Sequence, residues 1–306
     1  MHVGNQSAVT EFILLGLSTN PLVQVLLFPI FLAIYMSTLI GNLLLIVAVK
    51  TDKRLHISMY FFLANLSFLD ICYTSVIVPN MLVNFFATKK KISFTGCTTQ
   101  VFFYLLMGET ECLLLALMAY DRYVAICNPL RYSMVMNTTV CLWMISMAWL
   151  TGCIISSIDL YFVFRLTFCG PNIINHFFCE APLLLQLSCS DTSSNNIVKL
   201  VGTAILAFIP LSLILFSYFR IITTIVKTHS GKYKTFSTCV SHLVVVVIFY
   251  GTAMFMYVRP EHADTEDTDK RVAVFYTVIT PMLNPLIYSL RNKDVKRAMR
   301  RLVRDK

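Results

Sequence analysis

The chain has 306 residues, of which 57% are hydrophobic and only 13% are charged, and its formal net charge is +9. Soluble domains carry about a quarter charged residues, so this composition excludes an ordinary soluble protein and indicates one that lies in a lipid bilayer. Because the sequence contains no soluble basic domain, the positive charge does not indicate nucleic-acid binding, and we expect no nucleic-acid partner.

Apolar segments long enough to cross a bilayer as helices, about 17 to 25 residues each, follow one another along the chain. We expect an all-α membrane protein, a bundle of seven transmembrane helices in a single domain over residues 1–306. Residues 1–24 form its N-terminus, 25–290 the bundle and 291–306 a tail. The expected spans are Val25–Val49, Ile57–Phe86, Gln100–Ile126, Val140–Phe162, Ile197–Lys227, Thr235–Val258 and Arg271–Leu290.

Basic residues predict the orientation of the bundle. The first apolar segment is longer than the core of a cleaved signal peptide, about 7 to 15 residues, so we expect an uncleaved N-terminus outside the cell. Seventeen of the 25 Lys and Arg residues then lie inside, although the run Lys89–Lys91 lies outside. This distribution follows the positive-inside rule. We therefore expect a multi-pass protein of the plasma membrane whose basic tail contacts anionic lipid.

The tail has the spacing of an amphipathic helix. Between Asp294 and Val303 the apolar residues recur every three or four positions and basic residues fill the others. Such a helix lies along a membrane surface with its apolar face in the lipid. We expect a short helix on the inner surface after the seventh span.

An acidic and a basic residue, Asp121 and Arg122, end the third apolar segment and are followed by Asn128-Pro129. Charged side chains at the last turn of a membrane helix lie where lipid gives way to water, so they can pair with each other or change partner when the helices move. We expect Asp121 and Arg122 to pair at rest and to form a switch at the inner end of the bundle.

Polar residues in the last three helices belong to the same switch. Asn284 and Pro285 interrupt the hydrogen-bond ladder of the seventh helix, so that Tyr288 can swing on the segment beyond them. Tyr218 lies toward the inner end of the fifth helix. In the sixth helix, His242 either titrates near neutral pH or is a hydrogen-bonded core histidine, which is the favoured interpretation.

Acidic residues also lie deep within the spans. At about 100° per residue, Glu111 shares one face of the third helix with Tyr104 and Arg122, whereas Glu109 points about 200° away from it. We expect Glu109 either to reach toward helices four and five or to be held protonated. Asp70 of the second helix and Glu111 either share a proton, hold a cation, for which sodium is the best candidate, or form a structural hydrogen bond.

Four cysteines lie on the outer side, where disulfides persist. They allow three pairings. We favour Cys97–Cys179, which joins the third helix to the long loop, and Cys169–Cys189, which closes that loop on itself.

Two more outer motifs have a functional interpretation. Asn5 begins an Asn-Gln-Ser acceptor for N-glycosylation. His176, Cys179 and Glu180 resemble a transition-metal site, but a disulfide at Cys179 would remove its thiolate, so we expect no transition metal there.

Four motifs together resemble those of rhodopsin-like G-protein-coupled receptors, in the form typical of olfactory receptors of the tetrapod-type class II branch. They are MAYDRYVAIC, SYFRI, KTFSTCVSHL and PMLNPLIYSLRN, in this order, and the match runs from Glu11 to Lys293. The resemblance implies a receptor, not an enzyme, that binds small volatile molecules and activates a stimulatory heterotrimeric G protein to raise cAMP. One departure is Ser58, where olfactory receptors usually have proline, and we expect it to loosen the start of helix two.

The resemblance also implies the site residues. The G-protein face would include Arg122, Tyr218, residues 234–242 and the start of the tail helix, and Asp70 matches an aspartate of the sodium site of such receptors. No other cofactor is implied. The odorant pocket would be lined by Tyr104, Leu105, Gly108, Glu109, Gly202, Thr203, Leu206, Tyr250, Ala253, Met254, Tyr257, Val274 and Thr277.

Other functions fit the sequence less well. An ion-coupled secondary transporter could use Asp70, Glu109 and Glu111 as its ion site, but such folds usually show paired repeats, and this sequence shows none. A membrane enzyme would need a cluster of catalytic groups at one depth, whereas His242 stands alone. A small-molecule receptor outside olfaction remains the alternative within the same fold.

Overall fold

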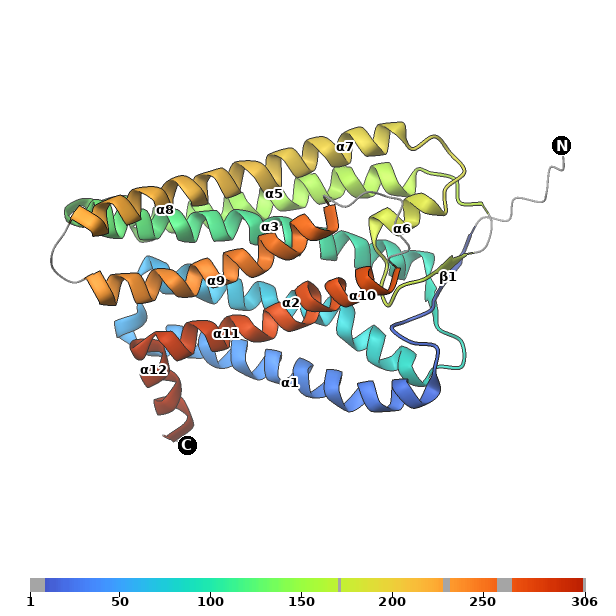
Figure 1. The fold of residues 1–306 in the computed structure, drawn as a ribbon, viewed down its shortest axis with the longest axis horizontal. Helices are drawn as coiled ribbons and strands as arrows, with labels where there is room; N and C mark the ends of the chain where they lie inside the picture. Colours follow the sequence, from blue (N-terminus) through green and yellow to red (C-terminus); the bar gives the residue numbers. More distant parts are fainter. Residues whose placement is uncertain (1–8, 170–171, 228–231, 258–265, 305–306) are drawn as a thin grey trace.

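The computed structural model describes residues 9–169, 172–227, 232–257 and 266–304, and it is a bundle of long helices that lie side by side (Figure 1). The glycosylation acceptor Asn5 lies outside the described residues. The long helices are α1 (Pro21–Thr51), α2 (Ser58–Phe86), α3 (Phe94–Cys127), α5 (Thr138–Phe164), α8 (Ile209–Lys227), α9 (Lys232–Tyr257) and α11 (Thr280–Arg291).

Two of the membrane helices contain a π-helical segment. The helix α7 (Ser193–Thr203) continues through η3 (Ala204–Phe208) into α8, and α10 (Glu266–Val274) continues through η4 (Phe275–Ile279) into α11. Within the described residues, six helical runs are long and apolar enough to cross a membrane, and α9 carries a shorter apolar stretch, Cys239–Phe255. The remaining expected span, Thr235–Val258, corresponds to α9, so the predicted seven-helix bundle is confirmed.

Polar caps set where several helices begin. The Asn20 side chain accepts a hydrogen bond from the Leu22 amide at 2.9 Å, and Ser93 and Asn137 cap α3 and α5 in the same way. A capping side chain satisfies an amide that has no partner inside the helix. These helices therefore begin directly after their capping residues, at Pro21, Phe94 and Thr138, ahead of the expected starts of the spans.

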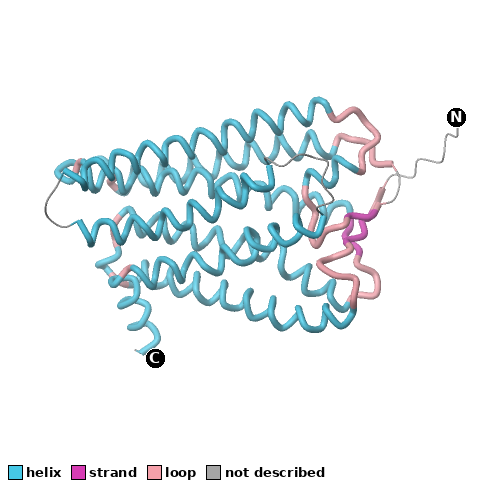
Figure 2. Tube along the Cα trace, viewed as in Figure 1, coloured by secondary structure: helices cyan, strands magenta, loops and turns pink. Residues whose placement is uncertain are grey.

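A small three-stranded sheet closes one end of the bundle (Figure 2). Strand β1 (Glu11–Leu14) pairs antiparallel with β2 (Lys91–Ser93) and parallel with β3 (Ile173–Ile174). Phe12 and Leu14 of β1 are fully buried, and an ion pair joins Glu11 to Lys91. We call this end of the bundle the sheet end.

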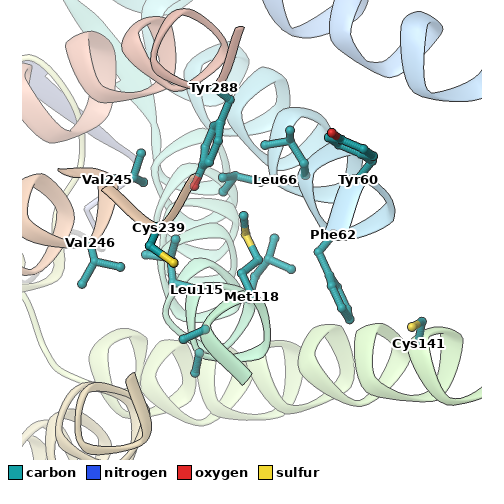
Figure 3. Close-up of a cluster of buried hydrophobic side chains, with 14 of the residues drawn as sticks. Tyr60, Phe62, Leu66, Leu115, Met118, Cys141, Cys239, Val245, Val246 and Tyr288 are labelled. Atoms are coloured by element: carbon teal, nitrogen blue, oxygen red, sulfur yellow. The ribbon is translucent and has the colours of Figure 1, made fainter. Parts of the chain in front are cut away.

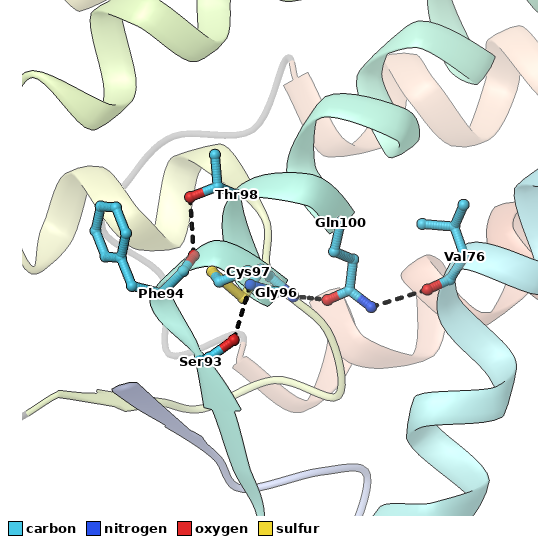
Figure 4. Close-up of a disulfide and its surroundings, with 8 residues drawn as sticks. Val76, Ser93, Phe94, Gly96, Cys97, Thr98 and Gln100 are labelled. Atoms are coloured by element: carbon cyan, nitrogen blue, oxygen red, sulfur yellow. Dashed lines mark hydrogen bonds between the residues drawn. A yellow bond between two sulfur atoms is a disulfide. The ribbon is translucent and has the colours of Figure 1, made fainter. Parts of the chain in front are cut away.

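The sheet end also carries both disulfides, Cys97–Cys179 and Cys169–Cys189, which are the favoured pairings. Beside the first, the Gln100 side chain accepts from the Cys179 amide at 2.8 Å and donates to the Val76 carbonyl at 3.0 Å (Figure 4). Cys179 therefore offers no thiolate to a metal, and the described residues contain no cluster of metal-ligating side chains. A short helix, α6 (Ala181–Gln186), follows in the same loop.

The opposite end carries the helix α12 (Lys293–Arg304), and we call it the tail end (Figure 1). The predicted helix is confirmed, but Val295 and Ala298 of α12 are buried in the apolar core of the bundle, where we expected this face to lie in the lipid. The Asn292 side chain donates to the Tyr60 hydroxyl at 2.8 Å, and Arg301 lies 3.5 Å from the Asp52 carboxylate. The short connections at this end are η1 (Lys53–Leu55), η2 (Pro129–Arg131) and α4 (Tyr132–Val135).

Candidate functional site

A polar cluster lies at the sheet end between α3, the disulfide-bonded loop and η4. The hydroxyls of Tyr104 and Tyr276 each donate to Oε1 of Glu180 at 3.3 Å and lie 3.2 Å from each other. Glu180 is only 6% exposed. It follows Cys179, so the disulfide to Cys97 holds it over α3. This acidic group is thus enclosed by the bundle and hydrogen-bonded to two membrane helices.

Aromatic rings surround this cluster. The Tyr104 ring lies 5.8 Å from that of Tyr73, 5.1 Å from Phe178 and 6.5 Å from Tyr276, measured between ring centroids. Tyrosines combine a large apolar surface with one polar group. Surroundings of this kind suit a small, weakly polar molecule.

Open space adjoins α3 at Gly108, one helical turn from Tyr104 toward the tail end. A Cβ atom built at Gly108 would have no heavy atom within 4 Å. At Gly152 of α5, by contrast, a Cβ would lie 2.5 Å from Oγ1 of Thr110. Gly108 therefore faces space that a side chain or a ligand can fill, whereas Gly152 allows two helices to pack closely.

Glu109, the next residue, faces α5 instead. Its carboxylate accepts a hydrogen bond from the Ser156 hydroxyl at 2.7 Å, and Asp159 of the same helix hydrogen-bonds to it as well. The Glu109 side chain is only 8% exposed. Of the two environments expected for it, the structure places Glu109 in the first, directed toward the fourth membrane helix.

The remaining pocket residues expected from the resemblance lie on six elements of the bundle. The Tyr250 hydroxyl lies 3.5 Å from the Cys112 carbonyl of α3, and Thr277 is buried and bonded to Ala273 of its own helix. The side chain of Tyr257 lies outside the described residues. Leu105 is on α3, Gly202 and Thr203 on α7, Leu206 in η3, Ala253 and Met254 on α9, and Val274 on α10.

The candidate sodium site lies in the middle of the bundle. Asp70 is fully buried, and the Asn284 side chain donates to both of its carboxylate oxygens at 3.1 Å. Oε1 of Glu111 and Oδ1 of Asn284 are buried and have no hydrogen-bond partner within the described part of the chain. Unpaired oxygens beside a carboxylate are the ligands that a hard cation takes, so these residues fit sodium.

The switch residues at the tail end differ from expectation in one contact. Asp121 accepts hydrogen bonds from the Ser58 hydroxyl at 2.5 Å and from the Tyr132 hydroxyl at 3.1 Å. Both Asp121 and Arg122 belong to the described residues, and no ion pair within 4.0 Å joins them. The expected Asp121–Arg122 pair is therefore wrong for this arrangement, because two hydroxyls satisfy the carboxylate.

Arg122 lies instead beside a small cavity. It shares the walls of this cavity with Met118, Ser241, Tyr288 and Asn292, among others. Figure 3 shows Tyr288 projecting from α11 into the apolar cluster that contains Met118. Tyr288 is 3% exposed and Arg122 6%. Arg122 is thus enclosed by the tail-end halves of α2, α3, α9 and α11.

His242 and Tyr218 form a second contact of this region. The Tyr218 hydroxyl lies 2.8 Å from Nδ1 of His242, and the two rings stack with centroids 5.7 Å apart. His242 is fully buried. The structure agrees with the favoured interpretation of His242 as a hydrogen-bonded core histidine.

Ser58 corrects another expectation. It is the first residue of α2, and its hydroxyl bonds both Asp121 and Tyr132, the latter at 2.6 Å. The serine therefore fastens the start of helix two to α3, where we expected it to loosen that start. The sequence did not predict these contacts of Ser58 and Tyr132, nor those of Glu180 and Tyr276 at the sheet end. The reason is that these side chains bond residues of elements that are distant in the chain.

Comparisons with known proteins agree on one family. A family model described as olfactory receptor matches residues 31–306. Olfactory receptor 10A7 of Homo sapiens is 50% identical over 304 residues, which cover 99% of this chain and 96% of that protein. Olfactory receptor 5AP2 of Mus musculus is 51% identical, covering 98% and 95%. The olfactory receptor-like protein OLF1 of Canis lupus familiaris is 49% identical, covering 98% and 97%.

A match of this extent and identity, on a bundle with this arrangement of helices, decides the family. The chain is a multi-pass membrane protein that belongs to the olfactory receptors, a family of G-protein-coupled receptors, and it is not an enzyme.

Proposed function

We propose that the chain is an odorant receptor of the plasma membrane with its sheet end outside the cell. It binds a small volatile molecule in the sheet-end half of the bundle and activates a stimulatory heterotrimeric G protein at the tail end, which raises cAMP. One observation carries this proposal: the helix α3 has open space beside Gly108 in its sheet-end half and Arg122 near its tail end.

The proposed ligand site lies among the aromatic residues around Tyr104. Most of its walls are apolar, so shape and burial supply most of the affinity. The hydroxyls of Tyr104 and Tyr276 and the carboxylate of Glu180 form one polar edge, and they hydrogen-bond one another at 3.2 to 3.3 Å. A ligand with a single hydroxyl or amine fits this combination, since its one polar group can join these hydrogen bonds while the rest is buried.

The proposed signal is a change in the arrangement of the helices that extend from the ligand site to the tail end. A ligand that contacts α3, η3 and α9 favours the arrangement in which it binds more tightly, and it shifts the equilibrium only by that difference in affinity. In the signalling arrangement the tail end of α9 moves away from α3 and uncovers Arg122, which is 6% exposed here. Arg122 then contacts the G protein, together with Tyr218 and the start of α12.

Sodium belongs to this proposal as a ligand of the resting arrangement. Asp70 and Glu111 would hold it, because Glu111 has a buried oxygen without a hydrogen-bond partner in the described structure. Bound there, the cation neutralises carboxylates that are otherwise expensive to bury.

The experiment is a cAMP assay in cells that express the chain with a stimulatory G protein. A panel of volatile alcohols, aldehydes, acids and amines is applied, and Arg122→Ala is measured beside the natural chain at the same surface level. A ligand-dependent rise that Arg122→Ala abolishes supports the proposal. If a chain at the cell surface gives no response to any member of the panel, the proposed ligand class or the proposed G protein is wrong.

A further inference from the structure

Three side chains from three elements meet at the tail end. The Ser58 hydroxyl at the start of α2 lies 2.5 Å from Oδ1 of Asp121 on α3 and 2.6 Å from the Tyr132 hydroxyl at the start of α4. The Tyr132 hydroxyl lies 3.1 Å from the same oxygen of Asp121. Asp121 is 1% exposed and Ser58 is 9% exposed, so water does not replace these contacts in this arrangement.

The protons available make Ser58 the centre of this group. Two hydroxyls supply one proton each, whereas three contacts are short enough for a hydrogen bond. The two shortest contacts, at 2.5 and 2.6 Å, are both hydrogen bonds when Tyr132 donates to Ser58 and Ser58 donates to Asp121. Hydroxyls in such a chain polarise each other and strengthen both bonds. Burial, followed by the nearby Asp121 charge, raises the pKa of Tyr132 to about 12, so the phenol keeps its proton at neutral pH.

Ser58 does not have the usual duty of a serine at a helix start. The N-cap of α2 is Ile57, which makes no side-chain cap, and Ser58 is the first helical residue. Its hydroxyl is used entirely for contacts to α3 and α4. Because a proline is well suited to the first helical position, Ser58→Pro keeps the start of the helix while it removes the hydroxyl, together with a backbone N–H that has no partner inside the helix.

We infer that Ser58 is a positioning residue of the switch: it fastens Asp121 and the α4 connection to α2 and thereby restrains signalling without a ligand. The restraint works on Asp121, which in this structure is held by Ser58 and Tyr132 and not by Arg122. Release of Asp121 frees the tail end of α3 and the α4 connection together. The effect on signalling rests on the proposed function, whereas the effect on the α4 connection does not.

The test compares Ser58→Ala, Ser58→Pro and Ser58→Thr in the full chain. Thr51→Ala is the control, because the Thr51 hydroxyl is close in sequence, is exposed and bonds only the Val47 carbonyl of its own helix in the described structure, at 2.9 Å. Two quantities are measured: cAMP without ligand at matched surface level, and hydrogen–deuterium exchange of residues 129–135 in the purified receptor.

Removal of the hydroxyl raises both quantities. Ser58→Ala and Ser58→Pro increase ligand-free cAMP by about threefold to tenfold, the range for one lost hydrogen bond to a carboxylate when Tyr132 partly replaces it. They also speed exchange at residues 129–135. Ser58→Thr, which keeps a hydroxyl, and Thr51→Ala behave like the natural chain.

The outcomes separate this inference from the proposed function. Unchanged exchange in both Ser58→Ala and Ser58→Pro overturns the inference, even if odorants still raise cAMP. Faster exchange with unchanged ligand-free cAMP, in a chain that responds to odorants, overturns the restraint on signalling. Faster exchange in a chain that never raises cAMP supports the positional role of Ser58 and counts against the stimulatory G protein.

Discussion

The side-chain amide of Asn284 donates to both carboxylate oxygens of Asp70, at 3.1 Å each. This contact joins α2 to α11 one residue before Pro285, where the hydrogen-bond ladder of α11 is interrupted. Glu111 of α3 is close enough to Asp70 to interact electrostatically. Three membrane helices therefore meet at one polar centre between the proposed ligand site around Tyr104 and the switch residues around Arg122.

Replacement of sodium by N-methylglucamine should raise ligand-free signalling and the potency of an agonist. The reason is that a cation which binds only the resting arrangement stabilises it by mass action. The measurement is a dose–response curve for cAMP in each medium. Glu111→Gln should lose this difference between the two media; a difference that persists at full size in Glu111→Gln would contradict the assignment of sodium to Asp70 and Glu111.

Two glycines should respond in opposite ways to alanine. Gly152→Ala places a Cβ 2.5 Å from Oγ1 of Thr110, and overpacking of this kind costs about 1 to 3 kcal/mol. Gly108→Ala meets nothing within 4 Å, and alanine favours a helix by about 0.5 to 1 kcal/mol over glycine. The melting temperature of the purified receptor should therefore fall only for Gly152→Ala.

The larger change Gly108→Leu fills the open space and should raise the agonist concentration needed for half-maximal cAMP. Surface level and thermal stability serve as controls for folding. A normal dose–response curve in Gly108→Leu would show that the ligand does not bind beside this residue.

The two disulfides should differ in their contribution to stability. Cys97–Cys179 closes a separation of 82 residues and Cys169–Cys189 one of 20, for which the chain-entropy model gives about 4.5 and about 3.3 kcal/mol. Cys97 and Cys179 are also fully buried. The paired Ser variant of the first disulfide should lose more surface expression and more thermal stability than that of the second. Equal losses would mean that loop length and burial do not decide how much each disulfide contributes to stability.

The disulfide-bonded loop should weaken in acid because of His176. His176 is 2% exposed, and its ring centroid lies 4.6 Å from that of Phe177 and 4.7 Å from that of Phe178. Burial, and then the charge of Lys270, lowers the pKa of His176 from 6.5 to about 3. The unfolded chain therefore binds a proton below pH 6.5 that the folded chain does not, so stability is complete above that pH and falls between about 6.5 and about 3.

The measurement is the melting temperature of the purified receptor at pH 7.5, 6 and 5. Linkage gives a loss of up to about 2 kcal/mol at pH 5. His176→Leu should show a smaller dependence on pH, whereas His56→Leu, at an exposed histidine of the tail end, should keep the full dependence. An unchanged slope in His176→Leu would assign the acid sensitivity to other groups.

The apolar segments predicted the helices because burial in lipid needs a continuous run of apolar residues, and that signal is local. The spacing of Val295 and Ala298 predicted α12 because helical periodicity is a local signal as well. The strands β1 to β3 gave no such signal: β3 has two residues, and its partner in β1 lies far away in the sequence. Short strands of this kind depend on the loop and the disulfide that hold them in place.

The candidate site was predictable where side chains share a helix and not where they cross between elements. Helical geometry predicted that Glu109 and Glu111 face different surroundings, and the structure places them so. The contacts of Glu180 with Tyr276 and of Ser58 with Asp121 depend on how loops and helix ends meet, which periodicity does not encode. Ser58 is the clearest case. A serine at the start of a helix is expected to cap that helix, whereas Ser58 bonds residues of two other elements.

The most direct test of the proposed function is nucleotide exchange on a purified stimulatory G protein. The purified receptor in lipid nanodiscs is mixed with the G protein, with and without an odorant that is active in cells, and a purified inhibitory G protein is measured in parallel. The account predicts that the odorant accelerates exchange on the stimulatory G protein and that Arg122→Ala abolishes this acceleration. No acceleration by a receptor that keeps both disulfides and its thermal stability, or acceleration with the inhibitory G protein alone, would contradict it.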